Sequence, residues 1–66
     1  MGIEIKIKRI RKGKKQKDLA EAVGISSQYL RLLENGESNN PSRNVMAKIA
    51  RELDCTVDEL FFKQNE

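Results

Sequence analysis

The chain has no histidine and no tryptophan, and it contains one cysteine, Cys55, and one proline, Pro41. Without histidine and with a single cysteine, one chain cannot assemble a zinc site or a disulfide framework. A lone thiol is typical of proteins from a reducing cytoplasm. The sequence also shows no cluster of carboxylates. We therefore expect no enzyme activity, no metal, no cofactor and no small-molecule substrate.

Long apolar runs are missing as well. The isoleucines near the N-terminus alternate with charged residues, so they do not form the apolar segment of a signal peptide. No stretch approaches the roughly 20 apolar residues that a membrane span needs. We expect a soluble, cytoplasmic protein without a membrane partner. Its 66 residues predict a single domain, residues 1–66, with a small hydrophobic core.

Charge is distributed unevenly along the chain. Residues 1–17 contain eight Lys or Arg and one acid, a net charge of +7, whereas residues 50–66 contain two basic and five acidic residues, a net charge of −3. A basic end favours a polyanionic partner such as nucleic acid. The alternative is that these basic residues only form the solvated faces of the opening helices.

The spacing of apolar residues predicts five short helices. The first, over residues 3–12, is indicated by Ile3, Ile7 and Ile10 at positions i, i+4 and i+7. The alternation of isoleucine with charge would also suit a strand, but the chain offers no second strand to pair with it. The remaining patterns predict helices at residues 16–23, 27–34 and 43–53, and a last turn or two after Thr56.

Residues 16–34 have the pattern of two short helices joined by a tight turn. Gly24 is suited to end the first helix, and Ser26 can begin the second by accepting a hydrogen bond from a free amide. Leu30 and Leu33 would face inward on the second helix, which leaves a polar arc on its other side. In helix-turn-helix proteins the second helix of such a pair lies in the major groove of DNA.

A wider set of residues at characteristic spacing extends across about residues 5–61. The set consists of Gln16, Leu19, Ala20, Gly24, Ile25, Ser26, Leu30, Leu33-Glu34-Asn35-Gly36, Pro41, Ser42 and Val57-Asp58-Glu59-Leu60-Phe61. This pattern resembles the Cro/repressor-type helix-turn-helix domain, the Xre family of bacterial and phage regulators. The resemblance implies an all-α fold, a compact lambda-repressor-like bundle of five helices with the helix-turn-helix at about residues 16–34.

The resemblance also implies a base-reading face on the second helix of the motif. That face would contain Ser27, Gln28, Arg31 and Leu32. Gln can hydrogen-bond adenine, Arg can form two bonds to guanine, and Leu can pack on a thymine methyl group. The alternatives are an ordinary solvated face for Gln28 and Arg31, and an accidental exposure of Leu32, which has little to pack on within one chain.

Further residues would bind the DNA backbone. Gln16 would contact a phosphate and could also hydrogen-bond Gln28, or it is simply a solvated residue of the first turn. Tyr29 either donates its hydroxyl to a phosphate or packs on the first helix. Asn39 and Asn40 could instead be plain turn formers. The complete set expected at the backbone is Lys15, Gln16, Lys17, Tyr29, Asn39, Asn40 and Arg43.

Three expectations from the resemblance concern structure and assembly. Arg9 and Glu34 match an ion pair that in relatives joins the first helix to the end of the reading helix. Cys55 matches a small apolar position, which favours a packed thiol over a redox switch. Phe61 and Phe62 are expected at a dimer interface. Phe61 looks like core and Phe62 is the better candidate for the contact, unless Phe62 belongs to a fraying aromatic end.

The expected function is a sequence-specific DNA-binding transcriptional regulator. It would be a repressor that binds a near-palindromic operator in double-stranded DNA as a homodimer. An antitoxin or a controller of restriction-modification genes would share the fold and the reading helix. A protein-binding adaptor is the alternative from another class, and it would use the same helix face with Leu32 and Phe62 as anchors.

Overall fold

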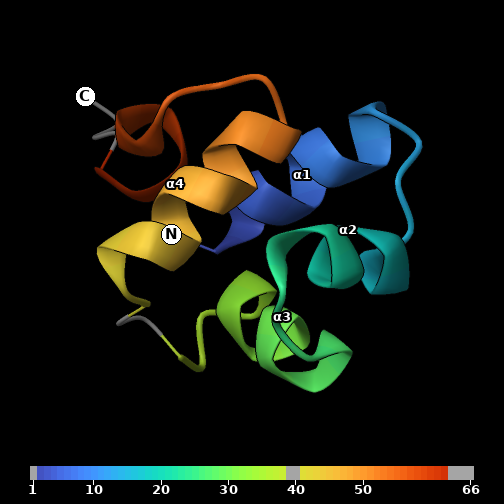
Figure 1. Ribbon diagram of the computed structural model, residues 1–66. Helices are drawn as coiled ribbons and strands as arrows, with labels where there is room; N and C mark the ends of the chain where they lie inside the picture. The colour runs from blue at the N-terminus through green and yellow to red at the C-terminus, as the bar shows by residue number, and fades with distance from the viewer. Residues whose placement is uncertain (1, 39–40, 63–66) are drawn as a thin grey trace.

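The computed structural model describes residues 2–38 and 41–62, and the regular structure within these ranges is entirely helical (Figure 1). This confirms the expected all-α bundle, with helix boundaries close to those predicted. The elements are α1 (Ile3–Arg11), α2 (Gln16–Val23), α3 (Ser27–Glu34), α4 (Arg43–Glu52) and a final π-helical turn, η1 (Asp58–Phe62).

Local hydrogen bonds set several of the helix ends. Gly24 ends α2 in the left-handed conformation, with φ of 88°, which a residue with a Cβ adopts only with strain. The Ser26 hydroxyl oxygen accepts a bond from the Tyr29 amide at 3.0 Å and so begins α3. Ser42 begins α4 in the same way, accepting from the Val45 amide at 3.1 Å. The helix-turn-helix therefore has the capping residues that its sequence predicts.

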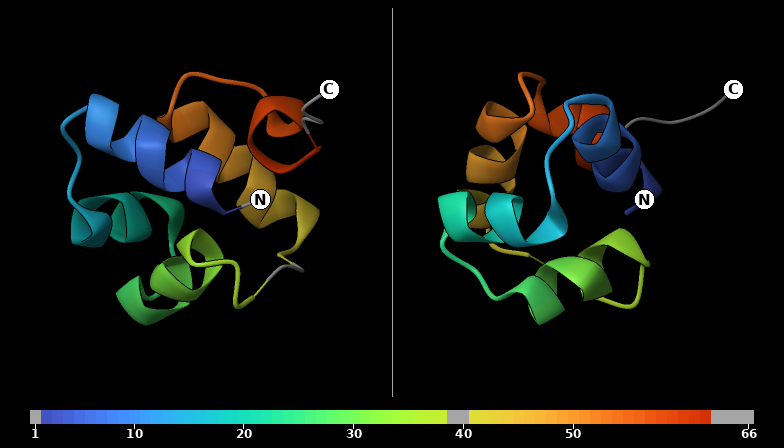
Figure 2. Two further views of the ribbon diagram at one scale, coloured as in Figure 1. Left: turned by 180° about the vertical axis from the view of Figure 1, so that it is seen from behind. Right: turned by 90° about the vertical axis from the view of Figure 1, so that its right-hand side faces the viewer.

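The core draws on every helix of the bundle. Each of the five helices contributes at least one large apolar side chain that is almost completely buried, and the most buried of these are Ile5, Leu19, Leu30, Ile49 and Leu60. α2 packs against both α3 and α4, while α1 contacts α3 and η1. Figure 2 shows α1 and α4 lying side by side above the α2–α3 pair. Because each helix supplies one such residue, no helix can be removed without exposing the core.

The first helix buries a face different from the one that predicted it. Ile5 is fully buried, whereas Ile3 and Ile10 are 51% and 57% exposed and Ile7 is half-buried. The three isoleucines at helical spacing thus lie on the outer side of α1. Helical periodicity shows that residues share a face, but it does not show which face the protein buries.

No helix within residues 2–38 and 41–62 is long and apolar enough to cross a membrane. The same residues contain no group of three or more His, Cys, Asp or Glu side chains that could hold a metal ion.

The start of α1 lies directly against the end of α3. Gly2 is buried, and a Cβ placed on it would lie 1.8 Å from the carbonyl oxygen of Leu33 and 2.8 Å from that of Glu34. Both oxygens belong to the backbone of α3, so neither can rotate out of the way. The sequence pattern did not indicate this contact, because a glycine beside the N-terminal methionine has no local signature.

We expect the substitution Gly2→Ala to destabilise the fold by about 1–3 kcal/mol, because the added methyl group must push α1 away from α3. Thermal unfolding followed by circular dichroism would measure the change. Lys6→Ala, at an exposed position one turn later on the same helix, is the matched control and should change stability little. Equal melting temperatures for Gly2→Ala and the unmodified protein would show that the start of α1 can move freely from α3.

Candidate nucleic-acid interface

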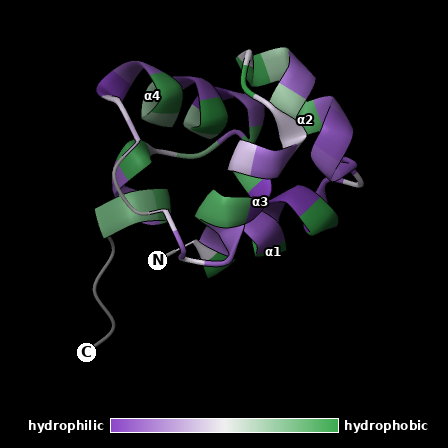
Figure 3. Ribbon diagram, turned by 90° about the horizontal axis from the view of Figure 1, so that it is seen from below, coloured by the Kyte–Doolittle hydropathy of each residue, from purple (hydrophilic) through white to green (hydrophobic). Residues whose placement is uncertain are grey.

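The outer side of α3 is polar and open to solvent. Leu30 and Leu33 are buried against the rest of the bundle, while Ser27, Gln28 and Arg31 on the opposite arc are all exposed. Figure 3, which views the bundle from the side of α3, shows this helix in front of the others. Nothing in the described bundle therefore covers these three polar side chains, which were expected to read bases.

Leu32 and Tyr29 differ from these polar residues. Leu32 is half-buried, so it has more to pack on within the chain than the sequence suggested. Tyr29 is also half-buried, and its ring packs against the hydrophobic core. Within the described residues the Tyr29 hydroxyl forms no hydrogen bond, which leaves it free to act as a donor.

Four of the residues expected at the DNA backbone, Lys15, Gln16, Lys17 and Arg43, lie at the starts of α2 and α4. Lys15 and Lys17 are exposed around the start of α2, and Arg43 is exposed at the start of α4. These two helix ends lie on opposite sides of α3 (Figure 1). Asn39 and Asn40, which were also expected there, fall outside the described residues.

A buried carboxylate joins the helices of the motif to α1. The side chain of Glu34, the last residue of α3, is only 1% exposed and receives a bidentate ion pair from Arg9. Arg9 Nε donates to Glu34 Oε2 at 2.7 Å and Nη2 donates to Oε1 at 3.1 Å. The remaining guanidinium nitrogen, Nη1, donates to the carbonyl oxygen of Lys14 at 3.0 Å. The ion pair implied by the resemblance is therefore present, and its carboxylate is almost completely buried.

Gln16 belongs to the same network. Its amide nitrogen Nε2 donates to Glu34 Oε1 at 3.0 Å, and no bond joins Gln16 to Gln28 in the described chain. A carboxylate only accepts hydrogen bonds, so it fixes the orientation of the Gln16 amide with the NH₂ group toward Glu34. This leaves the Gln16 oxygen and one N–H available outside the network, at the first turn of α2 where a phosphate was expected.

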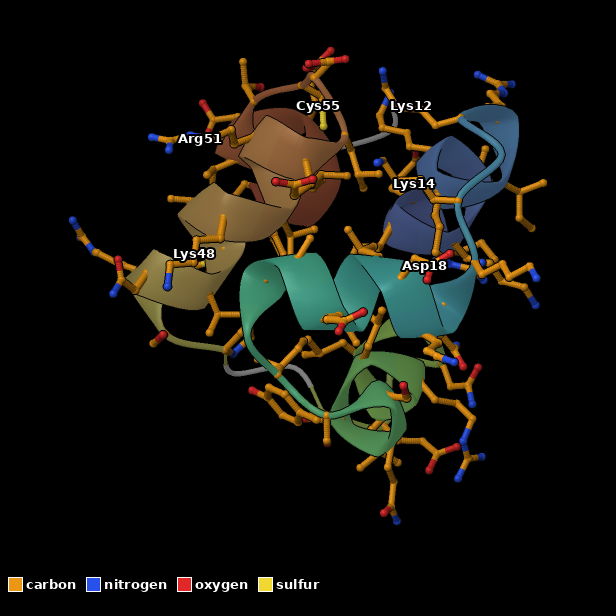
Figure 4. All side chains as sticks on the ribbon, turned by 45° about the vertical axis from the view of Figure 1, so that its right-hand side comes forward. Lys12, Lys14, Asp18, Lys48, Arg51 and Cys55 are labelled. Atoms are coloured by element: carbon orange, nitrogen blue, oxygen red, sulfur yellow. The ribbon has the colours of Figure 1, made fainter. Side chains whose placement is uncertain are left out.

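The basic N-terminal segment does not form one continuous charged surface. Lys12 forms an ion pair with Asp54, and Lys14 lies 4.0 Å from the carboxylate of Glu52. Lys12 and Lys14 thus lie where the end of α1 meets the end of α4 (Figure 4). The hydrogen bond and the charge of Lys12 lower the pKa of Asp54 below its ordinary value. Part of the positive charge of residues 1–17 is therefore paired with carboxylates of the acidic segment and is not free to bind a polyanion.

Cys55 packs at the edge of the hydrophobic core and is half-buried. Burial raises the pKa of its thiol above the ordinary value, so less of the reactive thiolate forms near neutral pH. Both observations fit the packed thiol that the sequence favoured over a redox switch.

A tight left-handed turn between α2 and α3, with a solvent-facing second helix, defines a helix-turn-helix DNA-binding domain. The model of the helix-turn-helix family of the Cro/C1 type matches residues 5–60, and the chain belongs to that family. The resemblance seen in the sequence is thereby confirmed. No sequence among curated proteins matches the chain.

Solved structures of one regulator, SinR, are similar to this chain. The N-terminal DNA-binding domain of SinR from Bacillus subtilis is 34% identical, with a TM-score of 0.87 over 98% of this chain and 94% of that domain. SinR in complex with DNA, described as the master regulator for biofilm formation, is 36% identical, with a TM-score of 0.83 over 89% of this chain and 94% of that one.

A third similar structure contains SinR bound to the protein SinI. It is 34% identical to this chain, with a TM-score of 0.86, and the match covers 94% of this chain but 60% of the SinR chain. The present chain therefore spans about three fifths of that SinR chain. Fold and family are those of DNA-binding regulators.

We expect Arg9→Ala to destabilise the protein by about 3–5 kcal/mol, because it leaves the buried Glu34 carboxylate without its main partner. Urea denaturation would measure the loss. Lys12→Ala is the matched control: it removes another cation of α1, but its partner Asp54 is exposed, so the loss should be much smaller. Equal losses for the two variants would mean that water reaches Glu34 in the folded protein.

Proposed function

We propose that this protein is a sequence-specific DNA-binding transcriptional regulator, and that it acts as a repressor in the cytoplasm. The observation that supports this most directly is the exposed polar face of α3, with Ser27, Gln28 and Arg31 directed away from the bundle. Gln and Arg can each form paired hydrogen bonds to purine edges in the major groove, worth about 1–3 kcal/mol of discrimination per good pair. Leu32, half-buried beside them, would add a contact to a thymine methyl group.

Contacts on both sides of α3 would hold this helix in the groove. Lys15, Gln16 and Lys17 at the start of α2 and Arg43 at the start of α4 would bind the phosphates of the two strands. The free amides in the first turns of these helices would help, because a helix N-terminus attracts anions. Tyr29, Asn39 and Asn40 complete the proposed backbone set. The orientation that Glu34 imposes on Gln16 suits a phosphate, since an N–H of its amide remains free.

In this proposal the protein binds DNA as a homodimer. Phe62 is 54% exposed at the end of η1, beside a surface hollow also lined by Arg43, Met46, Ala47 and Val57. A partner copy could cover this apolar ring. Phe61, by contrast, is 6% exposed and packs in the core, so its part in an interface would be to support Phe62, whose ring centroid lies 6.5 Å away. Two α3 helices would then read half-sites about one helical turn apart, roughly 34–36 Å.

Other functions remain compatible with parts of this site. An antitoxin or a controller of restriction-modification genes would use the same reading helix and differ only in the genes that it controls. For a protein-binding adaptor, α3 would need an apolar surface. Three of the four outer residues of α3 are polar and exposed, and the fourth, Leu32, is half-buried. This composition favours DNA over a protein on α3.

Selection of bound sites from random duplex DNA, at about 150 mM salt, tests the proposal. We expect enrichment of an inverted repeat whose half-sites lie about one helical turn apart. Binding of the selected site should weaken by orders of magnitude over a fourfold rise in salt, because phosphate contacts release counterions. No enrichment, with retention of DNA only at low salt, would contradict the proposal and favour the adaptor.

The two classes of DNA contact should respond differently to substitution. Gln28→Ala should reduce discrimination at one or two base pairs and leave the salt dependence unchanged, because Gln28 is proposed to contact bases. Arg43→Ala should weaken binding to all sequences alike and lower the salt slope by about one phosphate. Competition binding to the selected site and its single-base variants, repeated over a salt series, would measure both effects. If Gln28→Ala weakened all sequences equally, α3 would not read bases through this residue.

A further inference from the structure

The outer side of α1 carries an apolar surface that neither the core nor the proposed DNA interface uses. This isoleucine surface consists of Ile3, Ile7 and Ile10, of which the first and last are more than half exposed. Single exposed apolar residues are common and need no explanation. Three at helical spacing form a continuous stripe about 10 Å long, since each residue advances a helix by about 1.5 Å. The exposed ends of this stripe, Ile3 and Ile10, are two of the three large apolar residues exposed in the described chain, which makes the stripe a candidate contact site.

The isoleucine surface is separate from the other functional surfaces. The opposite face of α1 holds Ile5 in the core and Arg9 in the ion pair with Glu34, which fixes the rotation of the helix. Seen from behind in Figure 2, α1 lies in front of α4 and above α3. The exposed ring of Phe62 lies next to α4 residues instead. Ile3 lies near the end of α3, whereas Ser27 and Gln28 lie in its first turn, so a molecule bound to α1 would leave these two residues accessible.

Positive charge borders the isoleucine surface on both sides. At 100° per residue, Lys6 lies on one side of the stripe and Arg11 on the other. Both side chains are exposed, and neither forms an ion pair within the described part of the chain. The only acid of α1, Glu4, is half-buried. An apolar stripe between two free cations complements a ligand that has an apolar stripe between carboxylates.

The surface beside Ile3 is also hollowed, between the start of α1 and the end of α3. This hollow is lined by Gly2, Ile3, Lys6, Glu34, Asn35 and Gly36. The hollow provides space for a side chain that extends past the end of the stripe, with Lys6 at its wall. The hollow therefore leaves room for part of a bound molecule at the Ile3 end of the stripe.

We propose that the outer face of α1 binds an acidic amphipathic helix of another protein. Apolar residues of that helix, spaced three or four apart, pack on the isoleucine surface, and its flanking Asp or Glu side chains pair with Lys6 and Arg11. The contact is small beside the roughly 800 Å² per partner of a standard interface, so it is weak and reversible. The same size and charge disfavour a second copy of α1, because an antiparallel pair centred on Ile7 brings the two Lys6 side chains together.

A synthetic helical peptide of about 15 residues tests this proposal, a length at which an alanine-rich helix begins to form in water. It carries Leu at positions i, i+4 and i+7 and Glu at the flanking positions. Titrated into ¹⁵N-labelled protein, it should cause saturable chemical-shift changes centred on residues 3–11. A control peptide with each Glu replaced by Lys should bind at least about tenfold more weakly, because it repels Lys6 and Arg11.

Variants of the protein identify the surface. The double substitution Ile3→Ser and Ile10→Ser should weaken binding of the acidic peptide by about tenfold or more, and the fold should persist because both side chains are largely exposed. Phe62→Ser, which alters the remaining large exposed apolar residue of the described chain, is the matched control and should leave binding unchanged. Lys6→Glu should weaken the acidic peptide and strengthen the basic one.

Several outcomes would overturn the proposal. Equal binding of the two peptides would mean that charge does not select the partner. Shift changes centred on α2 and α3 would mean that the peptide only mimics the charge of DNA. Sedimentation showing a dimer that the Ile3→Ser and Ile10→Ser substitutions dissociate would identify a second copy as the occupant. Absence of binding at millimolar peptide would mean that this face has no such ligand.

Discussion

The ion pair between Arg9 and Glu34 is the interaction on which the arrangement of the other elements depends. Glu34 ends α3 with a side chain that is 1% exposed, and a carboxylate in such a place is costly unless donors surround it. Arg9 of α1 and Gln16 of α2 are those donors. One buried carboxylate thus ties three helices together, and it orients both α3 and Gln16, the proposed phosphate contact.

The same constraint separates the surfaces of the molecule. Because Arg9 faces Glu34, the core side of α1 is determined, and the isoleucines at positions 3, 7 and 10 must face outward. Because Leu30 and Leu33 pack inward, the polar arc of α3 remains open. The basic and acidic ends of the chain meet through Lys12 and Lys14, which reduces the free charge near α4. The proposed DNA contacts and the proposed contact with a protein helix therefore use different helices of this small protein.

Much of the fold could be predicted because its signals are local. The caps at Ser26 and Ser42 and the left-handed turn at Gly24 each depend on residues within one helical turn. The exposed positions of Gln28 and Arg31 follow from the period of α3 once Leu30 and Leu33 are buried. α1 shows where this reasoning fails: its most regular apolar stripe predicted a helix correctly, yet that stripe faces solvent, because Ile5 alone supplies the buried apolar contact of α1.

The sequence by itself determined the five helices, the caps at Gly24, Ser26 and Ser42, the helix-turn-helix and the family, because these depend on short-range spacing that survives any packing arrangement. Only the tertiary structure decided that Gln16 bonds to Glu34 instead of Gln28, that Gly2 touches the backbone of α3, and that Leu32 is partly covered. These contacts join residues that are far apart in sequence or belong to different helices. Their geometry exists only after the helices have packed, so no local pattern could specify it.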